Sequence, residues 1–106
     1  MIVFLSLYSP NGMENVTGFI DILGVTYEIV QVDASSLPDG YRGLCDSSHA
    51  KITLSNDLPS SVRRQILLHE ITHAISDSLG MELTEEQVSS IGTGLASITQ
   101  LSIDAD

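Results

Sequence analysis

Tryptophan is absent from this 106-residue sequence, cysteine occurs once, and only four residues are basic. The single cysteine, Cys45, excludes an internal disulfide framework and favours a reducing compartment, so we expect a cytoplasmic protein. No stretch approaches the ~20 apolar residues that span a membrane. The apolar residues 1–5 lack a preceding Lys or Arg and are followed by polar residues, which argues against a signal peptide. We therefore expect neither membrane insertion nor secretion.

The scarcity of basic residues leaves the charge one-sided. Four Lys and Arg face fourteen Asp and Glu, which gives a net charge of −10. Such a field repels phosphate backbones and anionic membrane surfaces, so neither nucleic acid nor a membrane is an expected partner. The acidity helps to keep a small protein soluble and tolerates a bound dication.

The length and the even composition predict one domain over residues 1–106, since no repeat, linker or low-complexity run interrupts the chain. Residues 1–17 are expected to form a loosely packed N-terminal arm, with a strand as the alternative for residues 1–5. The β-branched and aromatic segments predict two strand pairs, at residues 19–23, 25–33, 41–46 and 51–55. Gly24 can supply the positive φ of a tight turn in the first pair, and the polar residues 47–49 form the turn of the second.

Two helices are predicted after the strands. The polar residues 55–57 can cap the first, Pro59 fits its first turn, and it runs to about Leu79 before Gly80. The second opens at Thr84 with a capping box and runs to about Gln100. Its glycines lower helix propensity, which close packing against another element would explain at Gly92 and Gly94. The expected fold is α+β, a small, largely antiparallel sheet packed on a long helix and a second C-terminal helix.

The first helix carries the motif with chemical content, His69-Glu70-Ile71-Thr72-His73. Two histidines four residues apart on a helix project from one face, so both imidazoles can reach one zinc ion at ~2.0–2.1 Å. Glu70 lies close to the same face, where its carboxylate can contact a zinc-bound water without displacing it. Zinc lowers the pKa of that water toward ~7, and the carboxylate can take its proton. A pair of surface histidines beside a solvated glutamate is the structural alternative.

A site of this kind needs a third protein ligand. Cys45 stands on a predicted strand, and Asp77 is better suited to a hydrogen bond with an imidazole N–H than to ligation. Glu85 and Glu86 open the second helix. At ~100° per residue, Glu85 lies roughly 85° from the centre of the apolar face and Glu86 roughly 175°, so Glu85 is the predicted ligand.

The sequence resembles the zincin peptidases that have a glutamate as third ligand, the gluzincins, and within them the minimal phage-type and ImmA/IrrE-like domains. The likeness covers about Tyr41 to Leu95: the strand pair with Gly43 and Asp46, the HExxH helix, and the segment from Thr84 to Val88. The resemblance implies His69 and His73 as zinc ligands, Glu70 as general base and an acidic residue of the second helix as third ligand.

The resemblance also implies that one strand borders the cleft and pairs with an extended substrate peptide. That strand is expected to consist of Lys51, Ile52, Thr53, Leu54 and Ser55. The residue that stabilises the transition state is not obvious, and His49 and Tyr41 are the polar candidates near the expected cleft.

The sequence therefore predicts a metallopeptidase with one Zn²⁺ per chain, acting on a peptide or protein. The alternative is a catalytically silent or latent zinc domain that serves as a protein-interaction module, with the metal holding two helices together. The sequence does not indicate the substrate or the oligomeric state.

Overall fold

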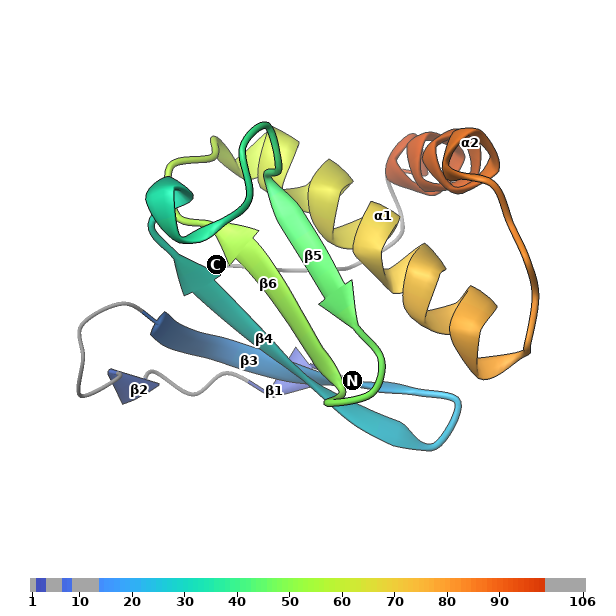
Figure 1. Cartoon of the computed structure of the whole chain (residues 1–106), viewed down its shortest axis with the longest axis horizontal. Coiled ribbons are helices and arrows are strands. Elements are labelled where there is room, and N and C mark those ends of the chain that lie inside the picture. The colour runs from blue at the N-terminus through green and yellow to red at the C-terminus, as the bar shows by residue number, and fades with distance from the viewer. Residues whose placement is uncertain (1, 4–6, 9–13, 99–106) are drawn as a thin grey trace.

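A mixed β-sheet and two α-helices make up the part of the chain that the computed structural model describes, residues 2–3, 7–8 and 14–98 (Figure 1). The predicted α+β fold is confirmed. The longer strands are β3 (Glu14–Ile22), β4 (Val25–Val32), β5 (Gly43–Asp46) and β6 (Lys51–Ser55). Two short strands, β1 (Ile2–Val3) and β2 (Leu7–Tyr8), and a 3₁₀ turn, η1 (Ala34–Ser36), complete the elements before the helices.

The strand order in the sheet is β1-β3-β4-β6-β5, with β2 also paired to β3. All pairs are antiparallel except β4 and β6, which run parallel with Glu28 opposite Lys51 and Val32 opposite Ser55. The sheet is thus largely antiparallel, as expected. The order places β5 at one edge and β6 between two partners, and this decides which strand can border a cleft.

The turn between β3 and β4 falls where it was predicted. Leu23 and Gly24 both have positive φ, 49° and 84°. Two successive residues in this region form the kind of two-residue turn whose twist matches that of the flanking strands. Gly24 adopts the conformation at no steric cost, whereas Leu23 is strained and leaves its side chain exposed.

For the described N-terminal residues, the alternative of a strand holds in place of the loose arm. Ile2 and Val3 pair with Ile20 and Phe19, and β2 pairs with β3 farther along the same strand. Since β3 begins at Glu14, the end of the supposed arm also belongs to the sheet. The other residues of the segment lie outside the described part of the chain.

The long helix α1 (Ser60–Ser78) lies against one face of the sheet, in contact with β3, β5 and β6 (Figure 1). Pro59 occupies the position before the helix, and no side chain caps it, so the predicted caps at residues 55–57 are wrong. Ser55 still belongs to β6, and its hydroxyl donates to Asp57 instead. At the other end Gly80 has φ 66°, as predicted. The helix contributes to the core Leu67, Leu68, Ile71 and Ala74, which pack with Ile20, Ile22, Tyr27, Ile29, Ile52 and Leu54.

The second helix, α2 (Glu85–Ala96), packs on α1 on the side away from the sheet (Figure 1). Its predicted capping box is present: Gln87 N–H donates to Thr84 Oγ1, and Thr84 N–H donates to the Gln87 side chain. The helix ends at Ala96 rather than near Gln100. Ser97 Oγ donates to the Gly94 carbonyl there, and Gln100 lies outside the described residues. Among the described residues, neither helix has the length and apolar character needed to cross a membrane.

Candidate metal centre

The two histidines of α1 stand side by side on the face that turns away from the core. Their ring centroids are 5.0 Å apart, and the ring planes meet at 68°. Positions on the opposite side of the helix, Leu67, Ile71 and Ala74, are buried. Burial of those side chains fixes the rotation of α1 about its axis and leaves His69 and His73 with 22% and 27% of their side chains exposed. Both imidazoles are therefore partly exposed on a helix whose rotation is fixed by the core.

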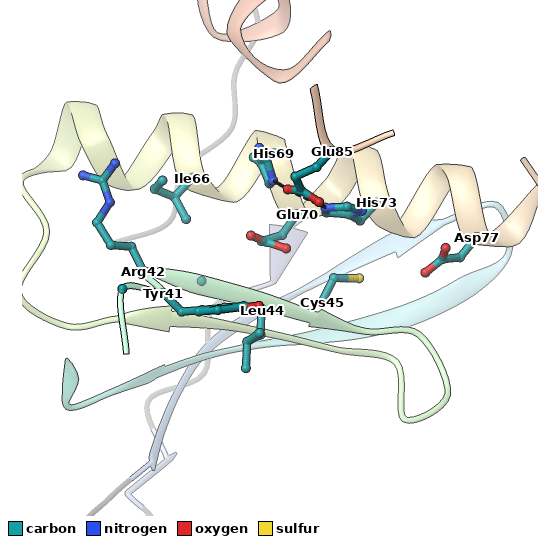
Figure 2. A pocket seen from close by; sticks show the side chains of 12 residues that line it. Tyr41, Arg42, Leu44, Cys45, Ile66, His69, Glu70, His73, Asp77 and Glu85 are labelled. Carbon is teal, nitrogen blue, oxygen red and sulfur yellow. Dashed lines mark hydrogen bonds and ion pairs between the residues drawn. The ribbon is translucent and has the colours of Figure 1, made fainter. Parts of the chain in front are cut away.

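Glu85 brings a carboxylate to these two rings from the first turn of α2. His69 Nε2 lies 2.7 Å from Glu85 Oε1, and His73 Nε2 lies 3.2 Å from Glu85 Oε2. Each imidazole N–H donates to the carboxylate, which can only accept when ionised. One ligand atom from each of the three side chains lies within 4.8 Å of the other two. The three residues could therefore hold a metal ion (Figure 2).

The distances from Glu85 to the two imidazoles are close to those around a tetrahedral ion. Ligand bonds of ~2.0–2.1 Å in tetrahedral geometry set neighbouring ligand atoms about 3.3 Å apart. Measured to the same oxygen, Glu85 Oε1, His73 Nε2 lies at this distance, 3.3 Å, whereas His69 Nε2 lies at 2.7 Å and needs to move outward by a few tenths of an ångström. Two nitrogens and one carboxylate oxygen are also a donor set that zinc accepts.

The electrostatics of Glu85 agree with this arrangement. Burial raises the pKa of its carboxyl group, but the hydrogen bonds from His69 and His73, together with their charges, outweigh burial and lower the pKa below its usual value. The carboxylate is thus ionised at neutral pH, as a metal ligand must be. The position agrees with the helical geometry that favoured Glu85, because Glu86, which is exposed like Glu85, belongs to no group of possible ligands in the described residues.

Glu70 faces the same space from below the two histidines. Its side chain is buried, with 6% of the residue exposed. Burial raises the pKa of its carboxyl group, the charge of Glu85 adds to this, and the charges of His69 and His73 oppose it. A Cβ built on Gly43 would lie 3.2 Å from Glu70 Oε2 and 2.7 Å from Ile66 Cγ2. Only glycine at this position of β5 lets the carboxylate and the strand approach so closely.

A cavity of about 500 Å³ lies between α1 and the edge strand β5, with the metal-ligand candidates along one side. In Figure 2, Glu70 points from α1 toward β5, and Glu85 bridges His69 and His73 above it. The cavity is lined by Gly40, Tyr41, Arg42, Gly43, Leu44, Cys45, Ile66, His69, Glu70, His73, Asp77 and Glu85. We call this space the cleft.

The two candidates for transition-state stabilisation separate in the structure. Tyr41 lines the cleft and is 53% exposed, so its hydroxyl has access to a bound molecule. His49 lies outside the cleft lining, in the turn between β5 and β6, where its Nδ1 is 2.8 Å from Asp46 Oδ2. Hydrogen bonds from Ser48 and then from His49 lower the pKa of Asp46. The position of His49 therefore removes it from the candidates.

Asp77 and Cys45 also line the cleft without joining the three ligand candidates. Asp77 accepts a hydrogen bond from Ser47 Oγ, which links α1 to the turn after β5, and within residues 14–98 it makes none with either imidazole. The expected Asp77–imidazole bond is thus replaced by this tether. Cys45 Sγ lies 3.7 Å from Ser47 Oγ, and burial raises the pKa of the thiol to about 11.

The assignment of the strand Lys51 to Ser55 as the partner of a peptide is wrong. All five of its residues pair with β4, and Lys51 to Leu54 also pair with β5, so β6 has no free edge. Ser55 N–H donates to the Arg42 carbonyl as well. The free edge next to the cleft belongs to β5, Gly43–Asp46.

The structure also adds residues that the sequence did not single out. Arg42 and Ile66 line the cleft beside the metal-ligand candidates. The one signal for Arg42 is its place immediately before β5 in a chain with four basic residues. Comparisons of the chain with protein-family models, with curated proteins and with solved structures found no match. The case for the site therefore rests on its geometry and its chemistry.

Proposed function

We propose that the chain is a zinc-dependent metallopeptidase in which His69, His73 and Glu85 bind the metal and Glu70 is the general base. Zinc held by these residues would supply Lewis acidity, acidifying water and polarising the carbonyl of the scissile peptide bond. One metal ion per chain fits the single group of ligand candidates found among the described residues. The single cysteine still favours the cytosol as the site of action.

The observation that carries the proposal is the position of Glu70. Its carboxylate lies in the same cleft as the three ligand candidates but is not one of them, and it is buried. A purely structural metal site needs no such carboxylate, and an unpaired acid is costly to bury. A base that accepts a proton during the reaction does need a site shielded from bulk water and within reach of the reacting atoms.

Glu70 performs the proton transfers of the proposed reaction. Its carboxylate accepts a proton from the attacking water while the oxygen adds to the carbonyl carbon. It then delivers this proton to the nitrogen of the leaving amine as the C–N bond breaks, so that one water is consumed for each bond. Tyr41, whose hydroxyl is accessible in the cleft, is the candidate that donates a hydrogen bond to the carbonyl oxygen as negative charge develops on it.

The edge strand β5 is the element that would hold an extended peptide. Its inner side pairs with β6, and its outer side is the free edge of the sheet beside the cleft. Unpaired backbone groups on such an edge can form main-chain hydrogen bonds with a peptide strand. A peptide bound there would pass under Glu70 and the two histidines, since a Cβ built on Gly43 in β5 would stand 3.2 Å from Glu70 Oε2.

The test is peptide hydrolysis by the zinc-loaded chain compared with its Glu70→Gln variant. The amide keeps the size of the side chain and removes the base, so the variant should keep its zinc and its fold. Loss of general-base catalysis should slow hydrolysis by ~10²–10⁴-fold. Equal rates for the two proteins would show that Glu70 is not the base.

The alternative is a zinc domain without catalytic activity, and one observation favours it. Glu85 belongs to α2, so a metal held with His69 and His73 would tie α2 to α1. Zinc would then raise the melting temperature while no peptide of a diverse library is hydrolysed. The buried Glu70 is what weighs against this reading.

A further inference from the structure

Charge is distributed unevenly along the cleft. Arg42 stands at one end and Asp77 at the other, with His69, Glu70 and His73 between them on α1 (Figure 2). The acid at the Asp77 end is tied to the turn after β5 by Ser47. The cleft is therefore polarised: among its lining residues, Arg42 is the one Lys or Arg, and it lies at the end opposite Asp77.

The Arg42 guanidinium is available to a ligand. Within residues 14–98 it makes no hydrogen bond and no ion pair, although the chain has fourteen acidic residues. Its backbone is fixed, because the Arg42 carbonyl accepts a hydrogen bond of 3.0 Å from Ser55 N–H. The backbone of Arg42 is thus anchored, while its five side-chain donors have no partner among the described residues. Such an arginine, in a protein that is otherwise acidic, is suited to bind an anion.

A second cavity continues the cleft at this end. It has a volume of about 280 Å³ and shares Arg42, Ile66 and His69 with the cleft. Its other lining residues are Gln65 of α1 and Ser89 and Thr93 of α2. Their amide and hydroxyl groups can all donate hydrogen bonds, and no acidic residue lines this cavity.

We propose that this cavity is a specificity subsite that binds a carboxylate of the peptide, with Arg42 as its principal contact. The inference rests on the proposed function and adds the chemical class of the substrate. The planar guanidinium matches a carboxylate with two parallel hydrogen bonds, and the neighbouring hydroxyl and amide groups supply further donors. Elsewhere on the protein, whose net charge is −10, a carboxylate of the peptide would be repelled. An acidic peptide should therefore bind in the register that places its carboxylate at Arg42.

The carboxylate can belong to an Asp or Glu side chain or to the C-terminus of the peptide. The two sources share the chemistry but differ in what they do to the cleavage pattern. A side chain places the scissile bond at a fixed distance from each acidic residue. A C-terminal carboxylate places it at a fixed distance from the end of the peptide, and amidation of that end removes the effect.

The experiment uses the zinc-loaded full chain and a synthetic peptide library randomised at its central positions, prepared with free and with amidated C-termini. Mass spectrometry identifies the cleavage sites. We expect the parent to favour a carboxylate at one fixed position by about 2- to 5-fold, the range of one solvent-accessible ion pair, and to lose this preference at high salt. Arg42→Gln should abolish the preference, and Arg42→Glu should replace it by a preference for Lys or Arg.

Arg64→Gln is the matched control, since it changes the net charge equally and Arg64 lies outside both cavities, with its guanidinium bonded to the Ile98 carbonyl. It should keep the preference of the parent. Cleavage without any preference for a carboxylate, or an equal preference in the parent and Arg42→Gln, would overturn the inference and leave the peptidase function standing.

A binding measurement separates the two proposals if no peptide is cleaved. The zinc-loaded Glu70→Gln variant is immobilised, and the peptides of the same library that it retains are sequenced. Enrichment of carboxylates that disappears when Arg42→Gln is added supports the subsite even in the absence of hydrolysis. Retention without such enrichment, or no retention at all, contradicts it.

Discussion

Gly92 of α2 lies directly against the backbone of His69 in α1, so that a Cβ built on Gly92 would stand 3.1 Å from His69 Cα and 3.3 Å from His69 N. The contact sets how closely the two helices approach at the candidate metal centre. Glu85 sits two turns earlier on α2, and its 2.7 Å contact with His69 depends on this approach. Gly92 thus lowers the helix propensity of α2 but allows the close approach of α2 to α1 at the candidate metal centre.

Gly92→Ala should therefore weaken metal binding and lower stability. The added methyl group meets backbone atoms that cannot rotate away, and overpacking of this kind costs about 1–3 kcal/mol. Gly94→Ala is the matched control two positions along, where nothing lies within 4 Å of an added Cβ. That variant should gain up to about 1 kcal/mol from helix propensity. Thermal unfolding with and without zinc measures both, and equal behaviour of the two variants would show that the contact does not matter.

Glu85→Ala should reduce zinc affinity by orders of magnitude, while Glu86→Ala leaves it nearly unchanged. The reason is that Glu85 contacts both imidazoles, whereas Glu86 belongs to no group of possible ligands among the described residues. Both substitutions remove one negative charge from the first turn of α2, so they change the helix terminus equally. Competition with a chromogenic chelator gives the affinities. The reverse pattern would move the ligand one residue along the helix.

Cys45 should react slowly with alkylating reagents. Burial, and then the charges of Glu70, Asp77 and Asp46, raise the pKa of its thiol from the ordinary 9.0 to about 11, although the Ser47 hydrogen bond lowers it. Below pH 9 this difference leaves about 100-fold less thiolate than in the unfolded chain, and the thiolate is the reactive form. Iodoacetamide labelling of the zinc-free protein at pH 8, folded and in urea, tests this. Similar rates in both would contradict the assigned environment.

The same raised pKa has a consequence for stability. The folded state holds the thiol proton more tightly than the unfolded chain does, and this difference contributes to the free energy of unfolding. The contribution is fully present below pH 9 and is lost as the pH rises toward 11. Cys45→Ala should remove this part of the alkaline destabilisation, which urea unfolding between pH 8 and pH 11 would show. An unchanged pH dependence in the variant would contradict it.

Much of the site could be predicted because its signals are local. The spacing of His69 and His73 places both on one helix face, and the Thr84 capping box fixes where α2 begins and hence the direction of Glu85. The β3–β4 turn at Gly24 is local as well. Each of these features depends on residues within a few positions of one another, where backbone geometry decides the outcome.

The features that the sequence did not predict depend on contacts between distant segments. The parallel pairing of β4 with β6 moves β5 to the edge, and no local pattern distinguishes an edge strand from its neighbour. The assignment of β6 as the peptide-binding strand failed for this reason. Close packing explains Gly92 but not Gly94, since the two face different surroundings on the same helix. Arg42 was not predicted because the cavity that it lines is formed together with residues of α1 and α2, which are distant in the sequence.

The most direct test of the account is the zinc content of the protein purified without chelator, compared with its His69→Ala variant. We predict one zinc per chain in the parent and none in the variant, with a lower melting temperature for the variant because metal binding and folding share free energy. His49→Ala, which removes a histidine outside the cleft lining, should retain the full metal content. A parent without zinc, or a His69→Ala variant that keeps it, would contradict the assignment of this site.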